Sequence, residues 1–594
     1  MDSNPLAIAG IVFIGAVTWY LGFHSSRLAN TTPDFLVARR IVRSSRNAAA
    51  IAGEYLSAAS FLGIAGLILK DGVDSLWYAV GFAAGHLALL LFVAAPMRRS
   101  GAYTLPDFAE ARLGSAGLRM LCTVFVVLIG IFYLVPQLQT AGLTLSTIMP
   151  VPPWAGGVVV IVLVTVNVFG GGMRSITVVQ AFQYWVKLFA LAAPAFILIM
   201  VFTTGHPANQ QVLSDNAPPH LSSATTITVQ TPVDLQVTAE VWLQAHGTLD
   251  GRPANGGTYW GPGTTHVVSA GTTLEFPAGA PVPTVDGSPG TNASWLRPEA
   301  GGLSALFGTY SLIIALFLGT MGLPHVLVRF YTNPTGRAAR RTTVHVLLLL
   351  GLFYLFPTVL GALARLYVPE LLITGQTDIA ILLLPGKVLP GFAGEALGAV
   401  IAAGAFAAFL STSSGLVVSV AGVLSTDALP GRVRDFRWAA LTAGAVALAL
   451  AVLLPPGDVS LSVGLSFALA ASTFCPVLVI GIWWRRLTWV GAAAGIVIGG
   501  GLVLSALVVN IVSEYTGAWA PWFVAQPALI TVPIAFGTVL LVSLATQRHL
   551  PLDVSRIMLR MHAPDRLGFI RDRDIVRFGT AEEQARLTNG KHRR

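Results

Sequence analysis

Apolar runs of roughly 20 residues recur along nearly the whole chain, and short polar or basic segments separate them. Such a run is long enough to cross the hydrocarbon core of a bilayer as a helix. The runs do not alternate between apolar and polar positions, as the strands of a membrane β-barrel would, and only helices satisfy the backbone of each run internally. The pattern predicts an all-α polytopic membrane protein of about thirteen spans, at 5–25, 48–69, 75–97, 117–148, 152–172, 175–204, 303–324, 342–366, 395–424, 438–455, 461–484, 488–512 and 524–546.

The composition supports a membrane protein. Hydrophobic residues make up 54% of the 594 residues and charged residues 11%, whereas soluble domains carry about 25% charged residues. The net charge of +9 does not indicate a nucleic-acid partner, because Lys and Arg lie in short clusters between the apolar runs. Cys122 and Cys475 lie in predicted spans without the spacing of a metal or redox site, so we interpret both as packing residues.

The placement of arginines predicts the orientation. Arginine clusters follow the odd-numbered spans, and they comprise Arg39, Arg40, Arg43, Arg46, Arg98, Arg99, Arg174, Arg337, Arg340, Arg341, Arg432, Arg434, Arg437, Arg485 and Arg486. The even-numbered spans are followed by few basic residues, mainly Lys70, Arg365 and Lys387. Because cytoplasmic loops are enriched in Lys and Arg, we expect the N-terminus outside and the basic tail 547–594 in the cytoplasm. The first run lacks a basic leader and a cleavage site, so it is expected to remain as a helix.

One long polar stretch, 205–302, separates the helices of residues 1–204 from those of residues 303–546. It is rich in Thr, Gly and Pro and falls on the predicted outer face. Its segment TTITVQTPVDLQVTAEVWL alternates as strands do. The stretch is therefore either a small extracytoplasmic β-domain or a disordered loop.

The second and seventh spans carry the signs of interrupted helices. The second contains AIAGEYLSAASFLGIAG and the seventh contains FGTYSLIIALFLGTMGLP. They lie five helices apart and cross in opposite directions, as an inverted repeat requires. Glycine-interrupted helices at corresponding positions of inverted halves indicate a midplane binding site in a secondary transporter, where freed carbonyls coordinate a cation and a half-helix N-terminus favours a carboxylate. Alternatively, these glycines only permit close helix packing.

The ninth span carries a row of hydroxyl side chains at its centre: Ser411, Thr412, Ser413 and Ser414. Hydroxyl and carbonyl oxygens at this depth suit a hard cation such as Na⁺. The alternative is that these hydroxyls bond to carbonyls of the preceding helical turn.

Other polar residues within the predicted spans are candidates for contact with a solute. Lys187 in the sixth span could orient a carboxylate, or it could snorkel or pair structurally. Gln137 in the fourth span could donate to substrate oxygens or bond neighbouring helices. Further substrate-binding candidates near the interruptions are Ser60, Thr309 and Tyr310.

Several stretches resemble the sodium:solute symporter family, and within it the cation/acetate symporters. They are DFLVARR, AIAGEYLSAASFLGIAG, YTLPDFAEARL, VVQAFQYWVKLFALAAPAFIL, GLPHVLVRFYTNP and the segment from Ser411 to Asp427. The resemblance implies the leucine-transporter type of fold, with spans 2–6 and 7–11 as inverted repeats of five helices. It also implies a Na⁺ site that uses the hydroxyls of Ser411 and Thr412 and the carbonyl of Ala408, completed by carbonyls near Gly53 and Leu56.

The chain departs from this pattern in the second span. Some relatives carry an aspartate where this chain has Tyr55, and the nearest carboxylate is Glu54. A buried Glu54 could bind or relay the coupling cation, or it could lie near the cytoplasmic end and reach lipid headgroups. Because a buried carboxylate can carry a proton, both Na⁺ and H⁺ stay open as the coupling ion.

The resemblance implies a symporter of the bacterial plasma membrane that couples Na⁺ or H⁺ influx to uptake of a short-chain monocarboxylate such as acetate, pyruvate or propionate. The rival functions are a symporter of another small solute (proline, a sugar), a solute-sensing receptor with a transporter fold, and a channel. We expect no enzymatic activity, because the sequence holds no catalytic constellation and no GxxxxGK[ST] phosphate-binding run. The sequence does not predict the oligomeric state.

Overall fold

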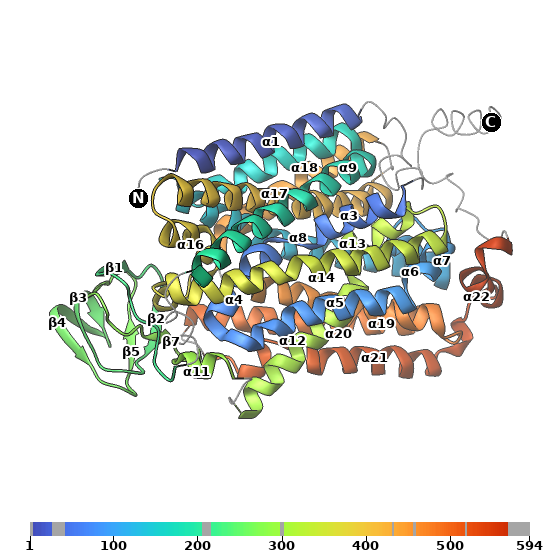
Figure 1. Ribbon diagram of the computed structural model, residues 1–594. Coiled ribbons are helices and arrows are strands. Elements are labelled where there is room, and N and C mark those ends of the chain that lie inside the picture. Colours follow the sequence, from blue (N-terminus) through green and yellow to red (C-terminus); the bar gives the residue numbers. More distant parts are fainter. Residues whose placement is uncertain are drawn as a thin grey trace.

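The computed structural model describes residues 4–26, 42–204, 215–297, 302–429, 433–454, 459–516 and 519–567. They form a body of long helices with a β-sheet domain at one end and the short helix α22 (Val554–His562) at the other (Figure 1). The segment DFLVARR and the last part of the basic tail, 568–594, lie outside the described residues. The protein is therefore a helical membrane protein with a separate β-domain.

The long helices follow the predicted spans. They are α1 (Pro5–Ser26), α5 (Leu76–Phe92), α8 (Ala116–Ile148), α9 (Trp154–Thr204), α12 (Gly302–Gly322), α14 (Gly336–Tyr367), α17 (Phe392–Val423), α18 (Val433–Leu453), α19 (Val459–Trp483), α20 (Trp489–Thr516) and α21 (Ala528–Ala545). Shorter helices connect them: α6 (Ala94–Ser100), α7 (Leu105–Leu113), α11 (Asn292–Trp295), α15 (Leu371–Thr374) and α16 (Ala380–Val388).

Within the described residues, eleven stretches are long and apolar enough to cross a membrane, compared with the thirteen spans expected. The predicted second and third spans form one apolar helical stretch, Ala59–Phe92, in which a 3₁₀ turn over Gly72–Ser75 separates two helices. The predicted fifth span is only a short apolar segment, Trp154–Phe169, and it forms the first part of α9. The hydropathy pattern predicted separate spans where the structure has continuous helical stretches.

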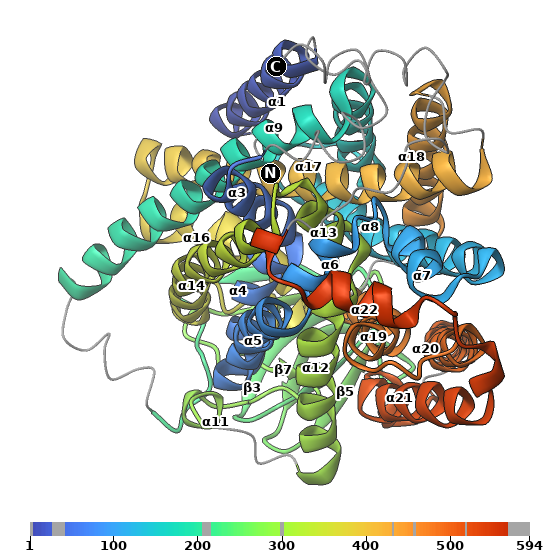
Figure 2. The ribbon, with the colours of Figure 1, turned by 90° about the vertical axis from the view of Figure 1, so that its right-hand side faces the viewer.

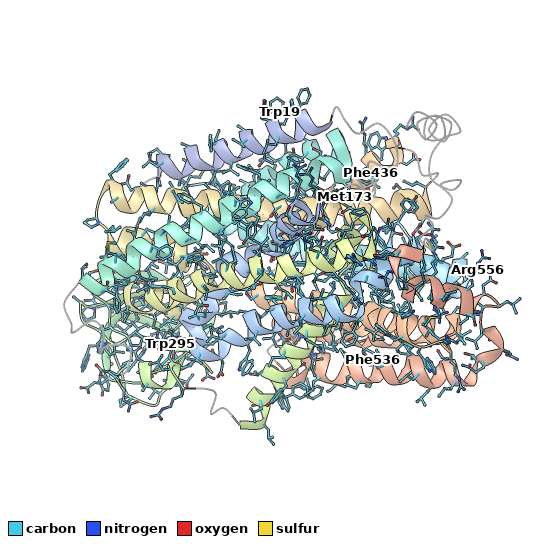
Figure 3. All side chains as sticks on the ribbon, turned by 45° about the vertical axis from the view of Figure 1, so that its right-hand side comes forward. Trp19, Met173, Trp295, Phe436, Phe536 and Arg556 are labelled. Atoms are coloured by element: carbon cyan, nitrogen blue, oxygen red, sulfur yellow. The ribbon has the colours of Figure 1, made fainter. Side chains whose placement is uncertain are left out.

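Burial distinguishes inner from outer helices. In α17, 94% of the most apolar stretch is buried, and in α19 89%, whereas the corresponding share is 33% for α1, α18 and α21. The end-on view places α1, α18 and α21 at the periphery (Figure 2). On α1, Trp19 points away from the bundle (Figure 3) and is 49% exposed, as a lipid-facing side chain would be. Cys122 and Cys475, the predicted packing residues, are both buried.

Both helices predicted to be broken are interrupted. The second predicted span divides into α3 (Ser44–Tyr55), a π-helical turn η2 (Ala59–Gly63) and α4 (Ile64–Asp71). The seventh divides into α12 and the short α13 (Pro324–Val328), with Leu323 in an extended conformation between them. Proline disfavours helical geometry in the residue before it, so Pro324 accounts for the position of the second interruption.

Residues 215–297 contain the β-domain. Its strands are β1 (Thr225–Thr228), β2 (Val233–Gln236), β3 (Val241–Leu249), β4 (Arg252–Trp260), β5 (Thr265–Val268), β6 (Thr273–Phe276) and β7 (Thr284–Val285). All pairings are antiparallel, in the order β1-β6-β3-β5-β2-β7 with β4 paired to β3. Alternate residues of β3 are buried, as in a strand that packs one face against a core.

The β-domain is attached to the helices by buried contacts. The indole of Trp295, labelled in Figure 3, donates to the carbonyl oxygen of Ile68 at 2.6 Å. Arg365 of α14 donates to the carbonyl of Pro289 at 3.1 Å and to the side chain of Asn292 at 3.3 Å. Arg365, one of the few basic residues after an even-numbered span, therefore joins α14 to the β-domain.

Candidate functional site

The interruption between α3 and η2 frees backbone groups for contacts with other helices. The Leu56 N–H still donates to the carbonyl of Ala52 at 3.0 Å, but the Ala58 N–H donates instead to the side-chain oxygen of Gln137 on α8, also at 3.0 Å. In a continuous helix each N–H would bond to the carbonyl four residues earlier. The helix is therefore open between these residues, and its last carbonyls face other parts of the bundle.

The freed carbonyls surround the ammonium group of Lys187. Lys187 Nζ donates to the carbonyl oxygen of Gly53, to that of Leu56 at 2.7 Å, and to the hydroxyl oxygen of Ser411 at 2.8 Å. The side chain is completely buried, so Lys187 does not snorkel to the membrane surface. Gly53 permits this approach, because a Cβ there would lie 2.3 Å from the carbonyl oxygen of Gln180.

The hydroxyl row of α17 completes the same site. Ser411 Oγ lies 2.7 Å from the carbonyl oxygen of Gly53 and 3.1 Å from that of Ala408, and it donates its single proton to one of them. Thr412 Oγ1 donates to the carbonyl of Glu54 at 2.7 Å. Thr412 thus joins α17 to the interrupted helix directly, and Ser411 joins it at least through the Lys187 ammonium; a Ser411 bond to Ala408 would be the alternative bonding within α17.

A buried ion pair lies one residue from this cage. Glu54 Oε2 accepts from Arg329 Nε at 2.6 Å, and the two side chains are 1% and 0% exposed. Arg329 also donates to Thr177 Oγ1 at 2.8 Å and to the side-chain oxygen of Gln180. Gln180 in turn donates to the carbonyl of Ser411 at 2.7 Å. Of the two alternatives for Glu54, the one in which it reaches lipid headgroups is wrong, because Arg329 holds its carboxylate inside the bundle.

Buried polar atoms without partners, and aromatic rings, lie on α8 and α13, next to the interruption that follows α3. Within the described part of the chain, Gln137 Nε2 and both ring nitrogens of His325 are buried without hydrogen-bond partners. The ring of Tyr133 lies 5.2 Å from that of His325 and 5.9 Å from that of Phe467. Because buried polar atoms normally have partners, these atoms are available to a polar ligand enclosed beside the interrupted helix.

The four predicted substrate-binding residues are divided between two locations. Gln137 is at the interruption, and Ser60 is buried nearby with its hydroxyl 3.1 Å from that of Tyr354. Tyr310 is 57% exposed on α12, and Thr309 adjoins it, whereas the interruption of this span lies at Leu323. The structure therefore does not bring Thr309 and Tyr310 to the interruption, because the helix is continuous through Gly308 and breaks before Pro324.

Sequence reasoning missed Arg329, Gln180 and Thr177. Arg329 lies in the segment GLPHVLVRF, and it is a charged residue close to an interrupted helix within an apolar stretch. That position is a signal of function, because ionisable residues inside membrane helices are costly. The partnership with Glu54 was not readable, since the two residues are far apart in the sequence.

Three of the five residues predicted to bind Na⁺ already bind another cation in this arrangement; the other two are Ala408 and Thr412. Gly53, Leu56 and Ser411 supply oxygen ligands of the right kind, but all three already bind the Lys187 ammonium. A Na⁺ held by the same oxygens would lie about 3 Å from Nζ, where two unit charges repel by about 5 kcal/mol at an effective dielectric constant near 20. The site is therefore a cation site whose contacts are made by a side chain.

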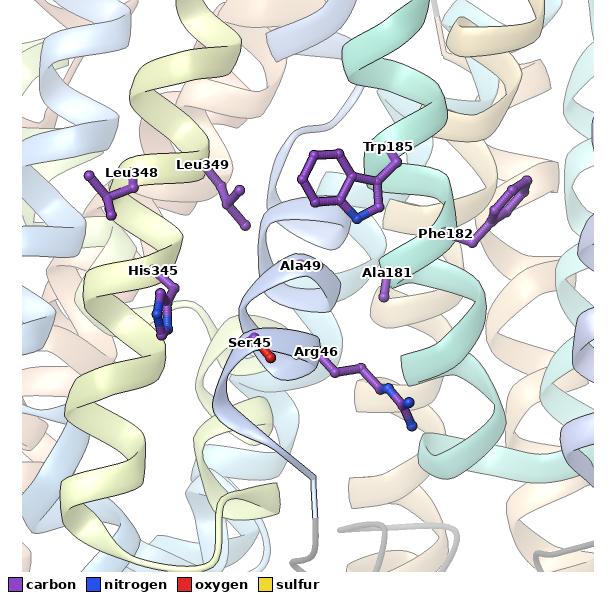
Figure 4. Close-up of a pocket in the computed structure, with 9 residues that line it drawn as sticks. All are labelled: Ser45, Arg46, Ala49, Ala181, Phe182, Trp185, His345, Leu348 and Leu349. Carbon is purple, nitrogen blue, oxygen red and sulfur yellow. The ribbon is translucent and has the colours of Figure 1, made fainter.

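A groove of about 490 Å³ lies behind α3, between α3, α9 and α14 (Figure 4). Ala49 and Ala181 line it, and Arg46 and His345 are polar groups at its wall. Leu348, also in the wall, is 68% exposed. Ala49 lies one helical turn before Gly53, so the groove is next to the outer side of the half-helix that carries the cage.

Comparison with known proteins identifies a family and several relatives. The profile of the Sodium:solute symporter family matches residues 35–243 and 293–499. The Monocarboxylic acid transporter of Corynebacterium glutamicum is 28% identical over 562 residues, which cover 90% of each chain. The uncharacterized symporter YwcA of Bacillus subtilis is also 28% identical, over 90% of this chain and 93% of its own.

A solved structure shows the same fold. The structure of a Na⁺-coupled sialic acid symporter, in a substrate-bound outward-open state, matches with a TM-score of 0.60 at 15% identity. The match covers 91% of this chain and 98% of that chain. With a family profile that spans most of the sequence, and relatives and a structural neighbour that are transporters, the chain belongs to the sodium:solute symporter family.

Proposed function

We propose that this protein is a secondary active symporter of the bacterial plasma membrane that couples entry of a cation, Na⁺ or H⁺, to uptake of a short-chain monocarboxylate such as acetate, pyruvate or propionate. The observation that carries the proposal is the charge at the interrupted helix. Lys187 and Arg329 contribute two positive charges and Glu54 one negative charge, which leaves a net +1 among the described residues of this network. A buried excess positive charge favours an anion beside the interrupted helix.

The groups beside the interruption suit a small carboxylate. Gln137 Nε2 is a buried donor without a partner among the described residues, and an amide N–H is a good donor to a carboxylate oxygen. The neighbouring aromatic side chains, Tyr55, Tyr133 and Phe467, are at most 1% exposed and fill the space around it. A substrate of few carbon atoms needs less rearrangement of these rings than a sugar does.

We infer that the interrupted helices are corresponding members of two inverted repeats of five helices, spans 2–6 and 7–11. The end of the bundle with α22 faces the cytoplasm, and the end with the β-domain faces outside; Figure 1 shows α22 and the β-domain at opposite ends. Movement of α3 into the groove beside Ala181 then opens the site towards the cytoplasm. The name of the Corynebacterium relative supports the substrate class.

The test is uptake of labelled acetate by proteoliposomes, with a Na⁺ gradient and a proton gradient imposed separately. Pyruvate, propionate, proline and glucose serve as competitors. Ser411→Ala is compared with Ser413→Ala, because Ser411 contacts Lys187 whereas Ser413 Oγ has no hydrogen-bond partner within the described residues.

We expect uptake under one gradient, competition by pyruvate and propionate, and loss only in Ser411→Ala. Competition by proline or glucose alone would indicate a symporter of another solute. Saturable acetate binding without accumulation would favour a receptor, and currents without a coupled gradient would favour a channel.

A further inference from the structure

The cage around Lys187 has the composition of a cation site but holds a side chain. Its acceptors are the carbonyl oxygens of Gly53 and Leu56 and the hydroxyl oxygen of Ser411, and they come from α3, the residue that follows α3, and α17. Every acceptor belongs to a residue that is at most 1% exposed or to a glycine inside the buried face of α3. The Lys187 ammonium is therefore enclosed on all its bonding sides by buried oxygens of two helices.

The number of donors matches the number of acceptors. An ammonium group has three N–H bonds and no acceptor, and Lys187 Nζ donates to three oxygens. The ammonium therefore uses its full capacity without water or another ion. A Na⁺ at this position would take the same oxygens and leave the ammonium unpaired in the protein interior, which is costly.

The surrounding charges also oppose a second cation. Arg329 donates to Glu54 through Nε and to Thr177 and the Gln180 side chain through its other nitrogens, so Glu54 already has a cationic partner. With Lys187 in place, the network carries one excess positive charge, and a bound Na⁺ would raise the excess to two. A carboxylate would lower it to zero.

We propose that the Lys187 ammonium is the permanent cation of this site, in the place that the family resemblance assigns to Na⁺, and that the site does not take Na⁺. The tethered cation stabilises the interruption of α3 in every turnover, because it bridges the carbonyls of Gly53 and Leu56 to Ser411. The consequence for transport rests on the proposed symport function, whereas the occupancy of the site does not.

The test is equilibrium binding of ²²Na⁺ to the purified full-length protein in detergent, without any transport step. Wild type is compared with Lys187→Ala, which removes the ammonium and leaves all three oxygens, and with Lys187→Ala/Ser411→Ala, which also removes one oxygen. We expect wild type to show no saturable ²²Na⁺ binding that depends on Ser411, Lys187→Ala to gain such binding, and the double variant to lose it.

Saturable binding by wild type that Ser411→Ala or Thr412→Ala abolishes would overturn the proposal. A folded Lys187→Ala protein that binds no Na⁺ would also overturn it, since its oxygens would then not form a cation site. If Lys187→Ala does not fold, the thermal midpoint decides: we expect any difference between NaCl and choline chloride to be the same in wild type and in Thr412→Ala. Stabilisation by Na⁺ that Thr412→Ala removes would contradict the proposal.

Because Na⁺ binding is measured without substrate, its result is independent of the acetate experiment. If the protein did not transport acetate, the measured Na⁺ occupancy of this site would still stand. Conversely, Na⁺ binding at this site would leave the proposed monocarboxylate uptake intact.

Discussion

The Glu54–Arg329 ion pair allows a quantitative prediction. Replacing Glu54 by Gln keeps the shape of the side chain and removes its charge, which leaves the Arg329 guanidinium with neutral partners only. Both side chains are at most 1% exposed, so water cannot replace the lost carboxylate. The variant therefore buries an unpaired charge.

The distance sets the size of the effect. Glu54 Oε2 lies 2.6 Å from Arg329 Nε, which places the centres of the two charged groups about 4 Å apart, where the attraction is about 4 kcal/mol at an effective dielectric constant of 20. Removal of one partner from a buried pair costs about 3–5 kcal/mol. We expect Glu54→Gln to lower the free energy of unfolding by about 3–4 kcal/mol.

The assay is unfolding by SDS titration in mixed micelles, followed by tryptophan fluorescence. The matched control is Asp565→Asn, which removes the carboxylate partner of Arg99 at 2.8 Å in a pair whose side chains are 13% and 16% exposed. An ion pair with access to solvent contributes about 0–1 kcal/mol to stability, so Asp565→Asn should lower the free energy of unfolding by no more than that amount. Equal losses in the two variants would refute the argument that burial makes the Glu54 pair important.

Three further substitutions and one control test the geometry of the site. Gly53→Ala places a Cβ 2.3 Å from the backbone of Gln180 and should lower folded yield in size-exclusion chromatography, whereas Gly308→Ala, with nothing within 4 Å, should not. Gln137→Leu removes a buried donor and also the acceptor of the Ala58 N–H, so folded yield should fall and the KM for acetate of the folded fraction should rise by about 10-fold or more in uptake assays; an unchanged KM would remove Gln137 from the substrate site. Ala181→Trp fills the groove behind α3 and should lower the uptake rate while acetate binding, measured by calorimetry, is unchanged; a normal rate would show that α3 does not move into the groove.

The long helices were predictable because each one needs only an apolar run to signal it. The hydroxyl row at Ser411 and the interruption after Tyr55 were visible for a similar reason, since each is a local pattern of residue types. The strands of 215–297 showed the expected alternation, but alternation alone did not distinguish a folded β-domain from a loop. Its attachment through Trp295 and Arg365 depends on residues outside the strands.

The contacts that define the site were not predictable, because they join distant parts of the chain. Lys187 was identified as an intramembrane charge, but its three acceptors lie on segments far away in the sequence. Arg329 was overlooked because its partner Glu54 is equally remote. The interruption of the seventh span was predicted near Tyr310 but lies at Leu323. Glycine is frequent in membrane helices and does not by itself mark a break.

The central claim is that this protein accumulates a monocarboxylate at the expense of a cation gradient. The most direct measurement is the time course of labelled acetate inside proteoliposomes after a gradient is imposed. The account predicts a transient internal concentration above the external one, which an ionophore that collapses the gradient abolishes. Equilibration that never exceeds the external concentration, by protein shown to be folded, would contradict it.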